Sequence, residues 1–291
     1  GNKEKALEKL LELLDALEEA DTSRRAAQID KDGNVTLSSE IQAGKPAAEK
    51  SAEDGTGESQ PLYMSLNHVM EYYIFAYYFQ PATEVRCTDI PYGEYYRTYG
   101  QLALSMQKYN GAKKAYERAI AWNPVDLDAY LGLAEVYKYQ NQREKYLTVT
   151  KQAYRYCCTR ATMARYYRNM AFYYLSGYEP ETARACYQYS NVYYHTENAD
   201  SELKYISEAI QQETPQTDIR AIQKLFDEKQ IEPGPDSQTI GIVYKVGEIL
   251  LKDGDYKLAK DCYSIVYDIT QDAAAEKMLN ELEAAISGSE E

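Results

Sequence analysis

The sequence has 291 residues, of which 44% are hydrophobic, enough to form a sizeable core in one elongated domain or two compact ones. Its net charge of −14 opposes binding to nucleic acid or to an anionic membrane, and no apolar run is long enough to span a bilayer. The odd count of five cysteines, with Cys157 and Cys158 adjacent, does not indicate a disulfide framework. We therefore expect reduced thiols and a cytoplasmic location.

The first 61 residues differ in character from the rest of the chain. Residues 1–41 predict an amphipathic helix over 3–20, followed by a hairpin around Asp32-Gly33. The acidic residues near this turn resemble a calcium loop, but the glycine comes two positions too early for that motif. Residues 42–61 are small, polar and dotted with proline and glycine, which is typical of a flexible linker. The helix carries a leucine stripe formed by Leu7, Leu10, Leu11 and Leu14. We expect this segment to dock weakly or separately.

From residue 62 to residue 291 the sequence is rich in aromatic residues and predicts helices joined by short turns. No strand pattern is found after Leu37, so we expect an all-α domain. The predicted helices span 63–79, 92–107, 111–122, 126–140, 143–156, 160–176, 179–194, 199–212, 217–230, 237–252, 255–269 and 272–286. The last of these carries many charged residues and is expected to act as a polar cap.

The helical region contains an internal repeat. The segments 110–120, 179–190 and 254–266 each place an alanine four residues before a tyrosine, followed three residues later by a small or apolar residue. This spacing keeps the three side chains on one helix face. Each segment follows a helix with its own small residue, Gly100, Ala171 or Gly247, where two helices must cross closely. Tyr96 and Tyr130 are 34 residues apart, a period that indicates stacked helix pairs.

This pattern resembles the tetratricopeptide repeat (TPR) family. The match is best from Tyr96 to Pro124, where Gly100, Ala112, Tyr116 and Ala119 occupy the family's positions. The best repeats are 93–126, 127–163, 164–197 and 240–273. The resemblance implies a right-handed α-superhelix of antiparallel helix pairs and a role as a protein–protein interaction scaffold, which is not an enzyme.

Residues with catalytic or metal-binding potential are few. The two histidines, His68 and His195, have no partner at metal-ligand spacing, and there is no C-x-x-C, nucleophile-elbow or phosphate-loop motif. We expect no catalytic residue, metal site or cofactor. The tyrosine pairs also suggest base stacking, but adjacent helical residues point about 100° apart, which favours core and surface packing.

The most distinctive charge feature is a basic band in an acidic chain. Residues 145–178 contain no Asp or Glu, whereas Arg165 and Arg168 stand one helical turn apart. Either acidic stretches of the same chain neutralise these cations, or they receive an acidic ligand. A resemblance to family members with a concave groove implies partner-binding positions at Arg97, Gln101, Leu131, Glu135, Lys138, Arg165, Arg168 and Phe172. We add Tyr139 to this set as an aromatic residue beside them. Gly132 stands where the peptide-carboxylate binders of the family need an asparagine.

The expected partner is another protein or an acidic, extended peptide. Two alternatives are an RNA-binding helical-repeat protein and a peptide-sensing regulator. The overall acidity argues against the first, and the lack of a basic helix-turn-helix argues against the second.

Overall fold

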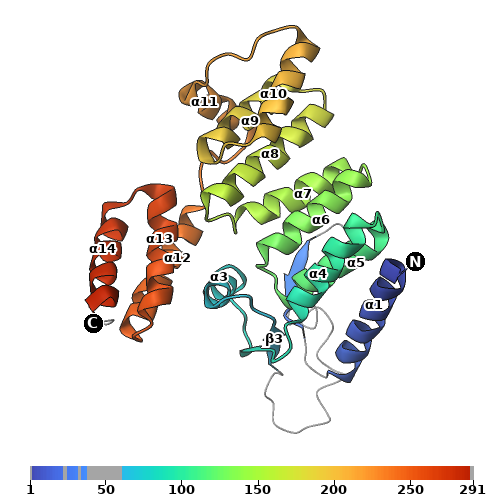
Figure 1. The fold of residues 1–291 in the computed structure, drawn as a ribbon, viewed down its shortest axis with the longest axis vertical. Helices are drawn as coiled ribbons and strands as arrows, with labels where there is room; N and C mark the ends of the chain where they lie inside the picture. Colours follow the sequence, from blue (N-terminus) through green and yellow to red (C-terminus); the bar gives the residue numbers. More distant parts are fainter. Residues whose placement is uncertain (1, 22–24, 32–33, 38–60, 289–291) are drawn as a thin grey trace. The chain divides into compact units, whose positions relative to one another are not determined.

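The computed structural model describes residues 2–21, 25–31, 34–37 and 61–288, and it is predominantly helical (Figure 1). The predicted linker at 42–61 lies almost wholly outside the described residues. The chain divides into two compact units, Gly1–Val149 and Thr150–Glu291, and the boundary falls within helix α7 (Arg143–Tyr154). We call them unit 1 and unit 2.

Unit 1 is built around three helices, α4 (Tyr92–Ser105), α5 (Tyr109–Trp122) and α6 (Leu127–Tyr139), which pack on one another. The side chain of Tyr116 fills the space between α4 and α6. A Cβ added to Gly100 would come within 2.9 Å of its ring, and a Cβ added to Gly132 would come within 2.3 Å. Both glycines are therefore needed for the close approach of the aromatic ring to the two helix backbones.

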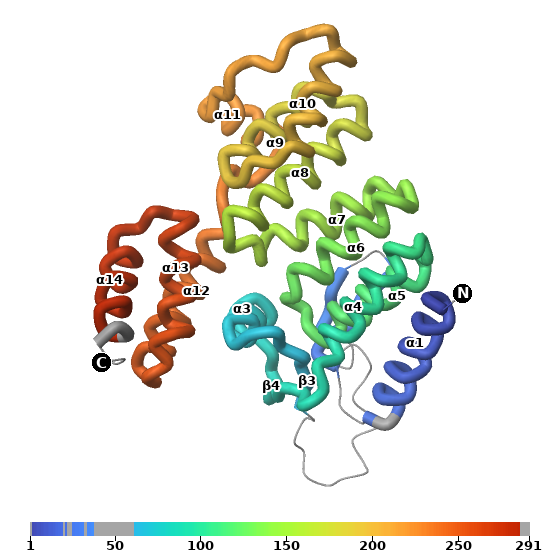
Figure 2. The backbone as a smooth tube through the Cα atoms, viewed as in Figure 1, coloured from blue at the N-terminus to red at the C-terminus, as the bar shows by residue number. Residues whose placement is uncertain are grey.

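Two short sheets and two further helices complete unit 1. An antiparallel pair, β1 (Ala27–Ile29) and β2 (Val35–Leu37), stands where the hairpin is expected. Helix α1 (Asn2–Ala20) lies alongside α4, with Leu7 and Leu14 buried (Figure 2). It therefore packs as part of unit 1, and the expectation that this segment docks weakly or separately stays a prediction.

The expectation that strands end at Leu37 is wrong. Residues predicted to begin a helix at 63 instead form β3 (Leu62–Met64), which pairs in parallel with β4 (Val85–Cys87), and helix α3 (Val69–Phe79) begins later. Leu62 and Met64 are fully buried on either side of the half-buried Tyr63, which is the two-residue period of a strand. Three residues are too few for that period to stand out beside a long aromatic helix.

Unit 2 contains the pair α8 (Arg160–Ser176) and α9 (Pro180–Tyr193), with α10 (Glu197–Ile210) and α11 (Ile219–Lys229) both packed on α9. A second group comprises α12 (Ser237–Lys252), α13 (Tyr256–Thr270) and α14 (Ala273–Gly288), each packed on the next. Helix α14 buries Ala275 and Leu282 and displays charged residues elsewhere, as expected of a cap.

The connection from α11 to α12 shows why tyrosine replaces phenylalanine in this core. The hydroxyls of Tyr167, Tyr189 and Tyr154 donate hydrogen bonds of 2.8, 2.5 and 2.9 Å to the successive backbone carbonyls of residues 232, 233 and 234. The rings stay in the aromatic core, while the hydroxyls supply hydrogen-bond donors to the backbone carbonyls of a segment that contains two prolines.

The repeat is visible in the backbone of the turns. Residues Gln107, Asn141, Tyr178 and Gly254 all have positive φ, between 54 and 83°, and each lies just after the first helix of a pair. In each turn the next residue's N–H bonds to a carbonyl of the preceding helix, as from Lys108 to Ala103 at 2.8 Å. The expected all-α helical repeat is confirmed, and no strand lies between residues 92 and 271, all of which are described.

Candidate functional site

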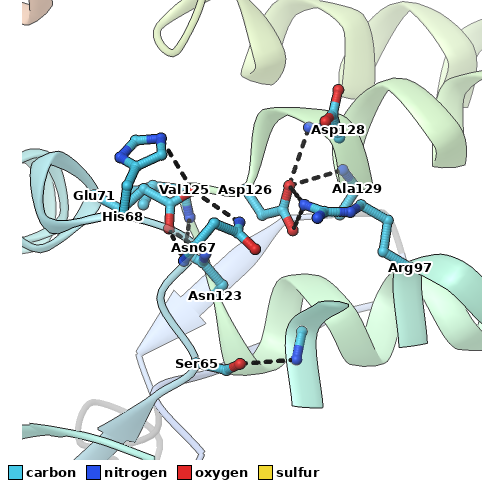
Figure 3. Close-up of polar contacts among 11 residues, drawn as sticks. Ser65, Asn67, His68, Glu71, Arg97, Asn123, Val125, Asp126, Asp128 and Ala129 are labelled. Atoms are coloured by element: carbon cyan, nitrogen blue, oxygen red, sulfur yellow. Dashed lines mark hydrogen bonds and ion pairs between the residues drawn. The ribbon is translucent and has the colours of Figure 1, made fainter. Parts of the chain in front are cut away.

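Arg97 on α4 is held in an ion pair. Its Nη1 donates to both carboxylate oxygens of Asp126, at 3.0 and 2.8 Å. The Arg97 side chain is 19% exposed and that of Asp126 only 2%. The same carboxylate accepts hydrogen bonds from the backbone N–H groups of Asp128 and Ala129, so it caps the N-terminus of α6 (Figure 3). The charge of Arg97 is thus neutralised by the start of the next helix pair.

A second buried carboxylate, that of Glu71 on α3, lies near this ion pair (Figure 3). It accepts hydrogen bonds of 2.7 Å from the backbone N–H of Asn67 and from Nδ2 of Asn123. Burial raises the pKa of the Asp126 carboxyl. The positive charge of Arg97 lowers this pKa, and the negative charge of Glu71 raises it further. These groups satisfy one another and tie α3 to the α5–α6 turn, which is a structural role.

The other predicted site residues of unit 1 differ widely in exposure. Gln101 is exposed, whereas Leu131 lies in the core. Glu135 and Lys138 form an ion pair at 3.8 Å on α6. Tyr139 is 58% exposed and its ring stacks on that of Tyr109, with centroids 5.6 Å apart. The Tyr109–Tyr139 pair is an exposed aromatic surface that the sequence did not reveal, because its members lie in different helix pairs.

The arginines of α8 are in a different state from Arg97. Arg165 and Arg168 are half-buried, and no acidic side chain in the described part of unit 2 forms a salt bridge with either. Nη1 of Arg168 is inaccessible to solvent and has no hydrogen-bond partner there. Burial, and then the neighbouring charge of Arg165, lower the pKa of Arg168. Two cations therefore lie close together without a counter-charge, and Phe172 follows one turn later on the same helix.

Other cations of the basic band are engaged elsewhere. The guanidinium of Arg160 donates to the backbone carbonyls of Tyr193 and Val192, at 3.0 and 2.8 Å, and so satisfies the C-terminus of α9. Lys145, in unit 1, lies over the ring of Tyr137 at 5.8 Å. Lys151 and Arg155 of the band are exposed, which leaves Arg165 and Arg168 as its half-buried candidate ligand-binding residues.

Reactive side chains do not gather into a site in the described residues. His195 is exposed and pairs with Asp200 at 2.7 Å, and His68 lies 3.9 Å from Glu71. Burial raises the pKa of Cys158 and of Cys262 to about 11, which makes their thiolates scarce at neutral pH. The part of the chain that is described holds no group of three potential metal ligands. It also contains no helix long and apolar enough to cross a membrane.

One segment of the chain matches a known protein family. Residues 93–126, which form α4, α5 and the turn that leads to α6, match the family model described as tetratricopeptide repeat. This chain carries a tetratricopeptide repeat. Such repeats serve in general as scaffolds for protein–protein interaction, because stacked helix pairs present extended surfaces. The observed TPR agrees with the resemblance drawn from Gly100, Ala112, Tyr116 and Ala119.

Solved structures also show some likeness to this chain. One is the Cut9–Hcn1 hetero-tetramer of the APC/C, at 14% identity and a TM-score of 0.38; the match covers 68% of this chain and 38% of that one. Another is pilF of Pseudomonas aeruginosa, at 15% identity and 0.37, covering 68% and 86%. A third is YrrB, described as a TPR protein with an unusual peptide-binding site, at 14% and 0.34, covering 64% and 91%. These TM-scores are too low to carry an inference about this chain. No curated protein matches it.

Proposed function

We propose that this chain is a cytoplasmic, non-enzymatic scaffold that binds acidic, extended segments of a partner protein, with a separate set of binding residues in each unit. The binding residues proposed in unit 2 are Arg165, Arg168 and Phe172 on α8. Those proposed in unit 1 are the exposed side chains of α4 and α6, with Arg97 and Leu131 as their support. This second set comprises Gln101, Glu135, Lys138 and Tyr139.

The observation that carries the proposal is the unsatisfied state of Arg168. A buried donor without an acceptor is costly, and a second guanidinium nearby adds repulsion. A carboxylate bound beside Arg165 and Arg168 would accept hydrogen bonds from their accessible guanidinium nitrogens and would offset the repulsion between the two charges. Arg184 in the next helix also has a buried Nη1 without a partner, but its charge is paired with Glu181, whereas no acidic side chain pairs with Arg168 in the described part of unit 2. The α8 arginines are therefore better suited to an external acid than the other arginines described here.

The test is charge reversal at α8. Full-length chain with Arg165→Glu and Arg168→Glu should keep its helical circular dichroism but capture its partner from an extract of its native cells at least tenfold less strongly. Tenfold corresponds to about 1.4 kcal/mol of binding free energy. Capture by the wild type should weaken as salt is raised, because the contact is electrostatic, and this dependence should flatten in the variant. Quantitative mass spectrometry of the captured proteins measures both effects.

The matched control is Lys252→Glu with Lys257→Glu. Both lysines are exposed, near the α12–α13 turn, and the substitution changes the net charge by the same amount. This control should capture the partner as the wild type does. Equal loss in both double variants would mean that only overall charge matters, and unchanged capture by the α8 variant would refute the assignment. Capture of RNA in place of protein would favour the RNA-binding alternative.

A further inference from the structure

Helix α1 is bound to the first repeat by a set of contacts that together describe a recognition site. Its leucines Leu7 and Leu14, two turns apart, are buried. The carboxylate of Glu18 accepts hydrogen bonds from the hydroxyl of Tyr96 and, at 3.1 Å, from Nε1 of Trp122. The site thus combines apolar contact along the helix with polar donors at its C-terminal end.

Further carboxylates of the α1 segment meet donors on α4 and α5. Asp21 accepts from the hydroxyl of Tyr92 at 2.8 Å, and Asp15 pairs with Arg118. Near the other end of α1, Glu4 pairs with Lys108 at 3.1 Å. Burial, and then Asp21, raise the pKa of Tyr92 to about 12, so its hydroxyl remains a donor at neutral pH.

The surface under α1 is formed by aromatic side chains of the repeat. The rings of Tyr92, Tyr96 and Trp122 are almost completely buried, and Tyr92 stacks on Trp122 with ring centroids 4.5 Å apart. Arg118 lies over the ring of Tyr96 at 5.3 Å. The aromatic rings are fixed by the packing of α4 on α5, and their polar atoms point at α1.

Helix α1, by contrast, is held only along one side. Leu13 is 57% exposed, and most of the acidic and basic residues of α1 are exposed. A cavity of about 350 Å³, lined by acidic residues of the α1 segment with Arg25, Arg118 and Trp122, lies at the seam between α1 and α5. A second cleft, of about 600 Å³, lies between β1 and α5 and is also lined by Arg25 and Arg118. The seam is therefore incompletely packed, and its ion pairs are open to screening by salt.

We infer that α1 is a displaceable arm, and that the face of α4 and α5 beneath it is a docking site for an amphipathic helix of a partner. The partner helix would present leucines two turns apart and carboxylates near its C-terminal end, as α1 does. Charge complementarity specifies this occupant, because the donors of the face are Arg118, Lys108 and the hydroxyl and indole groups. This inference does not depend on the arginine site of α8.

The experiment uses the full-length chain with Leu7→Ser and Leu14→Ser, which releases the arm. Its probe is a fluorescent synthetic peptide of residues 2–21, followed by fluorescence anisotropy. The released variant should bind this peptide at least tenfold more tightly than the wild type, whose site is occupied. A matched peptide with Leu7→Ser and Leu14→Ser should bind the released variant at least tenfold more weakly than the unchanged peptide. Binding of a peptide with Asp15→Asn and Glu18→Gln should depend much less on salt concentration.

Hydrogen exchange of the same samples controls for folding. The amides of α4 and α5 should keep their protection in the released variant, whereas those of α1 should lose theirs. Loss of protection in α4 and α5 would show that α1 is an integral part of the core and would overturn the inference. Equal peptide affinity for the wild type and the released variant, or no binding by either, would also overturn it. A wild-type dimer that disappears on release of the arm would identify the occupant as α1 of a second copy, against the partner helix proposed here.

Discussion

The interpretation of Gly132 changes from a position in a binding site, in the sequence, to a packing position in the structure. In the sequence it stands where related peptide-binding repeats require an asparagine. In the structure a Cβ at this position would lie 2.3 Å from the ring of Tyr116, which is 2% exposed and cannot move aside without disturbing α4. Gly132 is therefore a packing residue, and an asparagine there is incompatible with Tyr116.

Substitution of this glycine should be destabilising. Gly132→Ala should lower the free energy of unfolding by about 1–3 kcal/mol, because the ring must be pushed out of a packed core. The matched control is Gly111→Ala on α5, where the nearest side-chain atom is 3.5 Å away, an ordinary contact. It should be stabilising by about 0.5–1 kcal/mol, since alanine is the better helix former. Urea unfolding followed by the fluorescence of the single tryptophan, Trp122, reports on unit 1 in both cases. A neutral Gly132→Ala would show that Tyr116 does not lie as described.

At the scale of elements, α6 begins where it does because Asp126 both caps it and pairs with Arg97. The cap alone contributes about 1 kcal/mol in typical helices. The ion pair adds a second role, because removal of one partner leaves the other half-buried and unpaired. Arg97 consequently ties α4 to the start of α6, and we propose that it positions the two helices for a ligand.

The two roles of Asp126 can be separated by Asp126→Asn. Asparagine keeps a cap oxygen but removes the charge, so the cost of about 3 kcal/mol that we expect comes mainly from unpaired Arg97. The double variant Arg97→Met with Asp126→Asn should recover much of this loss, which a double-mutant cycle in urea would measure. Should Asp126→Asn cost only a few tenths of a kcal/mol, Arg97 would be free to serve a ligand.

Most elements between residues 92 and 288 were predictable, because their apolar periodicity and turn residues agree. The helix at 160–176 has the predicted bounds, with Thr159 as its cap, and α12 at 237–252 also matches. The strands β3 and β4 were not predictable. Each has three residues, and its partner strand lies more than twenty positions away, so neither leaves a pattern in the local sequence. The docking of α1 depends on Tyr96 and Trp122, which the sequence marks only as core aromatics.

At the scale of the whole molecule, the candidate site was predictable in kind but not in detail. The absence of acids from residues 145–178 indicates a basic surface, and the repeat indicates which helices carry it. Which cations are free depends on contacts between distant residues. Arg97 is neutralised by an acid 29 positions away, and Arg160 is hydrogen-bonded to backbone carbonyls 32 and 33 positions away. Arg165 and Arg168 form no salt bridge in the described part of unit 2, and Nη1 of Arg168 has no hydrogen-bond partner there.

The central claim, that α8 receives an acidic segment of a partner protein, is tested most directly by site-specific cross-linking. A photoreactive benzoyl-phenylalanine in place of Phe172 should cross-link to the captured partner, and Arg165→Glu with Arg168→Glu should abolish the product. The same probe in place of Tyr256, which is 48% exposed on α13, should give no product. Cross-linking from position 172 that survives the charge reversal, or equal cross-linking from position 256, would contradict the account.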